Sequence, residues 1–288
     1  MNYYRKVGKV LKIIFIANII VALTKIIVGS MMNYSSLLAD GYHAITDSTS
    51  NIIALIGIKI SSKPPDKHHP YGHYKFETIA GFFIGMMLLG ITAKIIYDAA
   101  NWFVSPVTAI LSIENILIIS VTLIINIFVT IIEIGIGRKL KSEVLVTDAI
   151  HTRTDVFISS GVIISMILVK LGLPPIIDPL LSLIIAVFVA YSCYQILKTT
   201  VGILVDKRVV DNEKIEELVY SVDSCIIDVH HIRNRGRENN IFIDLHIIVP
   251  GEMTVIEAHN LSHRIQEALR EHYNNDLDLY VHIEPNER

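Results

Sequence analysis

The chain has 288 residues, 52% of them hydrophobic and 18% charged, with a mean hydropathy of +0.51 and a formal net charge of −3. This balance is too apolar for an ordinary soluble domain and indicates a membrane protein. Residues 207–288 carry a net charge of −7 and 7 of the 12 histidines, whereas residues 1–206 carry +4. We therefore predict a membrane domain over residues 1–206 and a cytoplasmic domain over residues 207–288.

Six apolar segments are each long enough to cross about 30 Å of hydrocarbon as a helix. They cover residues 10–30, 36–60, 77–103, 112–137, 144–171 and 176–204. No small-residue cleavage site follows the basic N-terminus, so we expect the first segment to be a retained span. Basic residues gather before the first segment and after the second and fourth, which predicts that both termini are cytoplasmic.

The connection after the second span reads PPDKHHPYGHYKFET and places three histidines and an aspartate within eight residues. Such a loop is able to gather a cation, although a solvated loop has the same composition. The spans themselves contain other polar residues, and for the asparagines among them we expect hydrogen bonds between helices. These residues are Asn18, Asn51, Asn126 and Glu133.

The tail is predicted to be a small α/β domain of order α-β-β-α-β, with its helices on one face of a three-stranded sheet. The predicted elements are a helix over 211–222, strands over 226–236 and 240–251, a helix over 254–273 and a strand over 277–285. Thr254 precedes the second helix as a good N-cap, with Glu257 three residues later.

Two spans carry the motif H-x-x-x-D, as His43 and Asp47 in the second and as His151 and Asp155 in the fifth. Residues four apart stack on one helix face, so two adjacent helices offer two nitrogens and two oxygens, a tetrahedral set suited to Zn²⁺. The alternative is polar contact between helices. Ionisable residues within a membrane are expensive and usually functional, which favours a metal site.

Asp40 and Asp148 each precede one of these histidines by three residues, where they are placed either to orient the imidazole or to cap and solvate the helix. An intramembrane metalloprotease also needs histidines one turn apart, but its H-E-x-x-H motif is absent: Ala44 and Thr152 follow the two histidines. The site is therefore predicted to hold and release a metal, and the protein is not expected to be an enzyme.

The segments LLADGYHAITDSTSN and DAIHTRTDVFISSG resemble the second and fifth spans of the cation diffusion facilitators, a family of divalent-metal/proton antiporters. The likeness covers essentially the whole chain. It implies a homodimer whose tail also binds metal. It also implies a transport site made by His43, Asp47, His151 and Asp155.

The same resemblance implies a smaller metal site in the loop, at Asp66, His69 and His73, with His68 as a spare ligand or a surface residue. It further implies an ion pair between Lys75 and Asp206 that joins the spans to the tail.

In the tail, the family's binuclear metal site corresponds to His230, His246, His259, His282 and Glu284, with glutamate where aspartate is common. His282 and Glu284 are two residues apart and share a strand face. His231 is an alternative to His230, although strand alternation places the two on opposite faces. Surface roles are the competing interpretation for all of these histidines, and His263 and His272 are expected to be surface residues.

We therefore predict efflux of Zn²⁺ from the cytoplasm in exchange for protons, across the cell membrane of a prokaryote and without nucleic acid. Fe²⁺, Cd²⁺, Co²⁺ and Mn²⁺ are alternative cargoes, although two imidazoles favour zinc over manganese. The rival hypothesis is a membrane metal sensor that transports nothing. A sensor would not need four ionisable ligands inside the spans, which argues against it.

Overall fold

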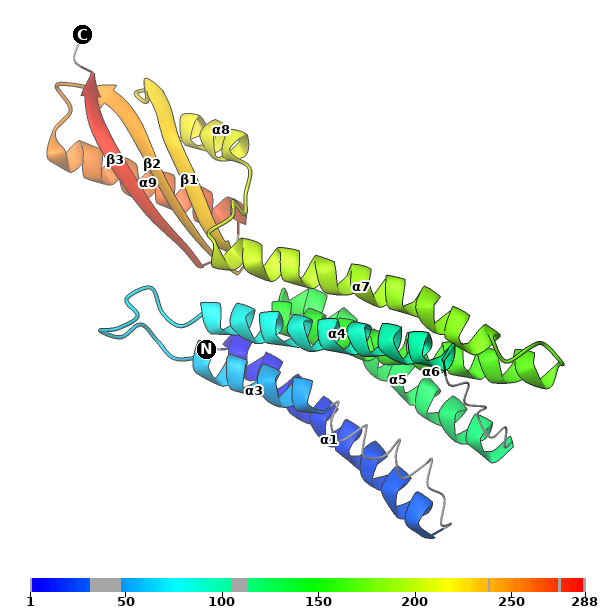
Figure 1. Ribbon diagram of the computed structural model, residues 1–288. Coiled ribbons are helices and arrows are strands. Elements are labelled where there is room, and N and C mark those ends of the chain that lie inside the picture. The colour runs from blue at the N-terminus through cyan, green and yellow to red at the C-terminus, as the bar shows by residue number, and fades with distance from the viewer. Residues whose placement is uncertain (1, 32–47, 105–112, 238, 274–275, 287–288) are drawn as a thin grey trace. The chain divides into compact units, whose positions relative to one another are not determined.

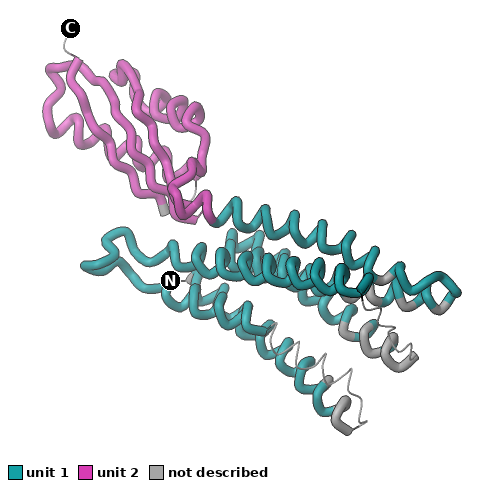
Figure 2. The backbone as a smooth tube through the Cα atoms, in the orientation of Figure 1, with its two compact units in different colours: residues 1–200 teal, residues 201–288 magenta. Residues whose placement is uncertain are grey.

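The computed structural model describes residues 2–31, 48–104, 113–237, 239–273 and 276–286 (Figure 1). The chain divides into two compact units, residues 1–200 and residues 201–288 (Figure 2). His43 and Asp47, the predicted ligands on the second span, lie outside the described residues, as does Asp40.

The first unit is built from long helices. Their bounds are Asn2–Met31 for α1, Thr49–Ser61 for α3, Lys75–Trp102 for α4, Ile113–Leu140 for α5, Glu143–Lys170 for α6 and Ile177–Leu204 for α7. In the described part of the chain, α1, α4, α6 and α7 are long and apolar enough to cross a membrane. Helix α5 adds 28 residues, and α3 is the described end of the predicted span over 36–60. A helical membrane region is thus confirmed.

The outer faces of these helices carry apolar side chains that would face water in a soluble protein. On α5, for example, Phe128 is 64% exposed and Ile131 is 63% exposed. Soluble monomers rarely expose apolar patches of this kind, and a lipid environment accounts for them.

Small residues allow α4 to approach α7 closely. A Cβ atom added at Gly85 would lie 2.9 Å from a methyl group of Ile196, and one at Gly81 would lie 3.3 Å from a methyl group of Thr200. The buried thiol of Cys193 also donates to the backbone carbonyl of Gly85, at 3.3 Å. The two glycines therefore serve close helix packing.

Glu77 ties the ends of several helices together. Its carboxylate, which is fully buried, accepts hydrogen bonds from the hydroxyls of Tyr3 on α1 at 2.8 Å and of Ser142 before α6 at 2.8 Å. Its backbone N–H donates to the hydroxyl of Ser61 at the end of α3. Three neutral donors and acceptors thus hold α1, α3, α4 and α6 in register around one buried acid.

The second unit is the predicted α/β domain. Its elements are α8 (Asn212–Val222), β1 (Asp228–Arg237), β2 (Asn240–Pro250), α9 (Val255–Tyr273) and β3 (Asp276–Asn286). The sheet order is β1-β2-β3, with β1 antiparallel to β2 and β3 parallel to β2, so that α9 forms the crossover (Figure 1). The predicted element order and fold class are confirmed.

Both helices pack on one face of the sheet. Every second residue of β2, from Ile241 to Val249, is buried in a core with apolar residues of both helices, namely Ile215, Val219, Leu261, Ile265 and Leu269. The capping box before α9 also forms, since the Thr254 N–H donates to the Glu257 carboxylate at 2.8 Å and the Glu257 N–H donates to the Thr254 hydroxyl at 3.3 Å. The even-numbered residues of β2 lie on the opposite face of the sheet, which neither α8 nor α9, the two described helices of this unit, covers.

Candidate metal-binding sites

His151 and Asp155 lie one turn apart on α6. His151 is 2% exposed, and neither of its ring nitrogens has a hydrogen-bond partner among the described residues. Burying two unpaired imidazole nitrogens is unfavourable unless something binds them. Asp155 is half-buried on the same helix face. The structure thus places two of the four predicted transport ligands side by side, with a histidine whose nitrogens are available to a metal.

A chain of polar side chains crosses the helices next to this pair. The Asn18 amide on α1 donates to the Asn51 carbonyl on α3 at 3.1 Å, and the Asn51 amide donates to the Asp148 carboxylate on α6. The expectation of interhelical hydrogen bonds is therefore met for both asparagines. Asp148 does not hydrogen-bond His151, so the suggested orienting role of Asp148 is not what the structure shows.

The loop between α3 and α4 brings together its three predicted ligands. Asp66, His69 and His73 have ligand atoms that all lie within 4.8 Å of one another. Each histidine has a ring nitrogen 3.4 Å from an Asp66 oxygen. His73 is nearly buried, whereas His69 and Asp66 are about half exposed. His68 lies outside this group.

The backbone of this turn stabilises the ionised form of Asp66, which is the form that binds a cation. Asp66 Oδ1 accepts the backbone N–H groups of His69 at 2.7 Å and His68 at 2.8 Å. The pKa of Asp66 lies below its usual range, chiefly because of the hydrogen bond from the His69 backbone. The carboxylate is therefore ionised at neutral pH. The hydroxyl of Ser61 donates to the His73 carbonyl at 3.1 Å and fixes the far end of the loop.

The predicted pair between Lys75 and Asp206 joins residues of two different units and stays a prediction. Within the second unit, Asp206 accepts a hydrogen bond from Arg235 on β1 at 3.3 Å. This contact ties the end of α7 to the sheet.

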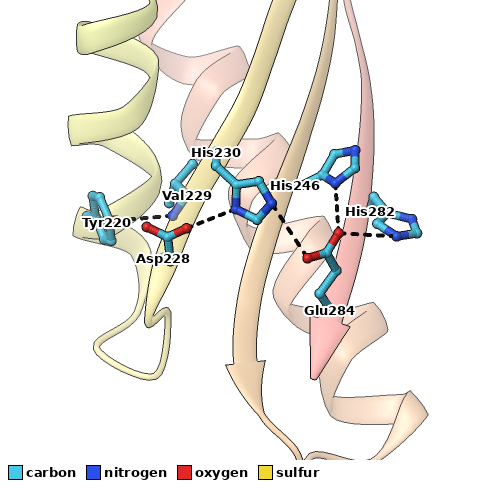
Figure 3. A network of polar contacts seen from close by, with 7 residues as sticks. All are labelled: Tyr220, Asp228, Val229, His230, His246, His282 and Glu284. Atoms are coloured by element: carbon cyan, nitrogen blue, oxygen red, sulfur yellow. Dashed lines mark hydrogen bonds and ion pairs between the residues drawn. The ribbon is translucent and has the colours of Figure 1, made fainter. Parts of the chain in front are cut away.

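The tail cluster lies on the open face of the sheet, opposite the helices (Figure 3). Its centre is Glu284 on β3, which contacts a histidine from each strand. Glu284 Oε1 lies 2.9 Å from His246 Nδ1 and 3.6 Å from His282 Nε2, and Oε2 lies 3.5 Å from His230 Nε2. The ligand atoms of His230, His246 and Glu284 lie within 4.8 Å of one another. The register aligns these side chains, because His246 pairs with His230 on one side and with His282 on the other.

The histidines hold Glu284 in its ionised form. The hydrogen bond from His246 is the main cause of a pKa of Glu284 below its usual range, and positive charge on the neighbouring imidazoles adds to it. A carboxyl whose pKa is lower in the folded state stabilises the fold above its unfolded pKa. That contribution is lost as the pH falls through the folded pKa. At neutral pH, Glu284 thus offers a charged oxygen to a cation.

Sequence reasoning missed the residues that orient His230. Asp228 Oδ2 lies 2.9 Å from His230 Nδ1, so that Nε2 points toward Glu284 (Figure 3). The hydroxyl of Tyr220 on α8 in turn accepts the Val229 N–H at 3.1 Å. A carboxylate behind an imidazole is the usual support of a metal-ligating histidine. The sequence signal for this contact is the spacing, since Asp228 and His230 are two residues apart.

The expectation that His230 and His231 face opposite ways is wrong. The pairing register of β1 and β2 shifts between His230 and Arg233, and His231 has a positive φ of 49°. Such a β-bulge breaks strand alternation and re-aims a side chain. The rings of both histidines consequently lie near His246, with centroids 5.4 Å away for His230 and 5.2 Å for His231.

His259 is not gathered into this cluster within one chain. It lies exposed on α9, and its Nε2 atom is 3.1 Å from Nε2 of His263, one turn along the helix. The two histidines therefore share one exposed helix face. His282 stacks on His246 at a centroid distance of 4.6 Å but stands outside the tight three-ligand group.

Apolar helices that carry a buried histidine one turn from an aspartate, joined to an α/β unit that gathers histidines around a carboxylate, are the features expected of a metal-transporting membrane protein. The chain belongs to the cation diffusion facilitator family. The cation efflux transmembrane domain matches residues 11–205, and the cytoplasmic domain of cation efflux proteins matches residues 208–286. This confirms the resemblance seen in the two span motifs. The protein is a multi-pass membrane transporter for metal-cation efflux and not an enzyme.

Relatives named for different metals are similar to this chain. An uncharacterized transporter of Methanocaldococcus jannaschii is 33% identical, over 97% of this chain and 99% of its own length. The manganese efflux system protein MneS of Bacillus subtilis is 24% identical, over 94% and 93%. The zinc transporter ZitB of Yersinia pestis is 28% identical, over 92% and 84%. The transported metal therefore has to be inferred from the ligands.

Proposed function

We propose that this protein exports Zn²⁺ from the cytoplasm in exchange for protons, as a homodimer in the cell membrane of a prokaryote with both termini inside. The observation that carries the proposal is His151, buried in α6 with both ring nitrogens unpartnered among the described residues and one turn from Asp155. Completed by His43 and Asp47, the set offers two nitrogens and two oxygens. That set suits Zn²⁺, whereas Mn²⁺ prefers oxygen ligands.

Exchange with protons follows from the chemistry of the ligands. Metal binds only deprotonated imidazole and carboxylate, so protons and metal compete for the same groups. A carrier that exposes the site alternately to each side would load metal inside, release it outside and return protonated. Cytoplasmic termini agree with the basic residues near the N-terminus and in the connections after the second and fourth spans.

The loop and the tail are proposed as cytoplasmic metal sites that report the metal concentration. Their support is the gathering of Asp66, His69 and His73 in the loop, and of His230, His246 and Glu284 in the tail. Metal bound there shifts the transporter only by as much as its affinity differs between two conformations. His259 and His282 are proposed as further tail ligands. Lys75 and Asp206 are proposed as a structural ion pair.

Transport of a panel of divalent ions tests this proposal. Purified protein in proteoliposomes is expected to move Zn²⁺ faster than Mn²⁺, Fe²⁺, Co²⁺ or Cd²⁺ at equal concentration, with proton flux in the opposite direction reported by an internal pH dye. Empty liposomes and protein without a pH gradient are the controls. Faster Mn²⁺ than Zn²⁺ transport would contradict the cargo, and metal binding without flux would favour a sensor.

The bulge allows a separate prediction about the tail. In a fragment of residues 201–288, which has its own core, His230→Ala should weaken Zn²⁺ binding more than His231→Ala. Of the two rings, only that of His230 is oriented by Asp228 and belongs to the three-ligand group. Loss of a residue that orients a metal-binding histidine typically lowers metal affinity about 10- to 100-fold. Loss of His230 itself should lower the affinity by more than that. Calorimetric titration of both variants measures the order, and the reverse order would assign the site to His231.

A further inference from the structure

Two acidic side chains lie in the membrane region outside the predicted metal ligands. Glu133 on α5 and Asp148 on α6 are both fully buried, with 0% of each residue exposed. Helices α5 and α6 are consecutive and joined by a short turn, so they pack along one another. Acidic residues at this depth are expensive and usually functional. We refer to Glu133 and Asp148 as the carboxyl pair.

The Thr152 hydroxyl links the two residues, because it lies 3.2 Å from Glu133 Oε2 and 3.2 Å from the backbone carbonyl oxygen of Asp148. Each also has one oxygen near a neutral donor: the Asn51 amide donates to Asp148 Oδ2, and the Thr152 hydroxyl donates to Glu133 Oε2 at 3.2 Å. The remaining oxygens, Glu133 Oε1 and Asp148 Oδ1, accept from no other described donor. Neighbouring buried carboxylates repel each other when both are ionised, which favours retention of one proton by the pair.

The surroundings do not supply a counter-charge that would keep both acids ionised. Among the described residues, neither acid forms an ion pair with a lysine or arginine. The elements packed around the pair contribute neutral Asn18 from α1 and neutral Ser50 and Asn51 from α3. The titratable groups that act on it are His151 and Asp155 on α6. Two like charges in an apolar interior cannot both ionise readily, so the pair keeps its proton until a cation approaches.

The carboxyl pair lies close in sequence to the proposed metal ligands on α6. Along α6, Asp148 precedes His151 by three residues, and Thr152, which contacts Glu133, follows His151 directly. A dication bound at His151 and Asp155 would offset a second negative charge on the pair. Both acids also lie between these ligands and the turn at Lys141, which the proposed orientation puts in the cytoplasm.

We propose that Glu133 and Asp148 form a proton-carrying carboxyl pair, separate from the metal ligands, that adds one proton to each exchange cycle. This inference rests on the proposed metal/proton exchange. When metal loads, the shared proton leaves to water on the cytoplasmic side and the pair goes from one negative charge to two. When metal leaves outside, a proton from that side returns to the pair. No bond other than O–H is broken or formed.

The experiment compares Glu133→Gln with the wild type in two measurements. Glutamine keeps the shape and an oxygen that accepts from Thr152, but it cannot release a proton. In proteoliposomes, the number of protons moved per Zn²⁺ should fall by about one, since the pair shares a single proton. In infrared difference spectra of the purified protein on adding Zn²⁺, the loss of the carbonyl band of protonated carboxylic acid should be smaller than in wild type.

Two further variants give the comparison its controls. Glu133→Asp, which keeps a titratable group, should restore both signals. Glu143→Gln changes another acid on α6 that is hydrogen-bonded by a hydroxyl, Thr78, at 3.0 Å, and should leave the proton ratio and the infrared band as in wild type. If Glu133→Gln does not fold, Asp148→Asn carries the same expectation.

The outcomes separate this inference from the proposed function. A folded Glu133→Gln protein with the wild-type proton ratio and the wild-type infrared band would overturn the role of the pair. Zn²⁺ transport by the wild-type protein without any proton flux would instead overturn the proposed exchange. A lower proton ratio in Glu133→Gln, rescued by Glu133→Asp, would support both.

Discussion

Replacing His151 with alanine is expected to lower Zn²⁺ flux into proteoliposomes by more than about 100-fold. Changes in the residues that merely support a metal ligand typically lower metal affinity or activity 10- to 100-fold, and His151 is proposed as a ligand itself. Its ring is buried with both nitrogens unpartnered among the described residues, so its removal leaves an apolar gap with three ligands for an ion that prefers four. Initial rates from the purified variant, normalised to the protein inserted, measure the effect.

The control for this prediction has to show that the variant is folded. His151→Ala should still bind Zn²⁺ through its tail and elute at the size of the wild-type protein. His68→Ala, which changes an exposed loop histidine outside the Asp66 group, should transport at the wild-type rate. Asp155→Ala should reproduce the loss of flux, since it removes another of the four proposed ligands. Flux close to the wild-type level in His151→Ala would refute the transport site as assigned.

The helices and strands follow from local patterns, which is why they were predictable. Continuous apolar stretches predicted the membrane helices, and the alternation of apolar and polar residues along β2 predicted a strand with one buried face. Thr254 and Glu257 mark the start of α9 through contacts within four residues of sequence. Each of these signals depends on residues that are close in the chain, so no knowledge of the tertiary structure was needed.

The parts that escaped prediction depend on pairing between distant segments. The side to which His231 points is set by a bulge in the ladder between β1 and β2, which no periodicity of β1 alone reveals. The link between Glu133 and Asp148 through Thr152 likewise depends on how α5 packs on α6. Sequence alone showed only that Glu133 lies within a predicted span. His282 and Glu284, two apart on one strand, were placed correctly on a shared face because strand alternation is local.

The tail should tune transport rather than perform it, and His246→Ala is the variant that separates the two roles. Its ring lies 2.9 Å from Glu284 and near the rings of His230 and His282, so removing it takes away the group that contacts all three of these residues. We expect the Zn²⁺ concentration for half-maximal flux to rise about 10-fold or more, with the maximal rate kept, because the proposed ligands in the spans are unchanged. Flux measured over a range of cytoplasmic-side Zn²⁺ concentrations gives both parameters.

A matched histidine change distinguishes this effect from a general disturbance of the tail. His272→Ala alters an exposed histidine near the end of α9, outside the tail cluster, and should leave the flux curve unchanged. Bound metal stabilises a fold by mass action, so Zn²⁺ should raise the melting temperature of wild-type and His272→Ala fragments of residues 201–288 more than that of the His246→Ala fragment. Equal stabilisation of all three fragments would remove His246 from the tail site. A flux curve for His246→Ala that overlays the wild type, despite weaker binding in the fragment, would show that metal in the tail does not regulate transport.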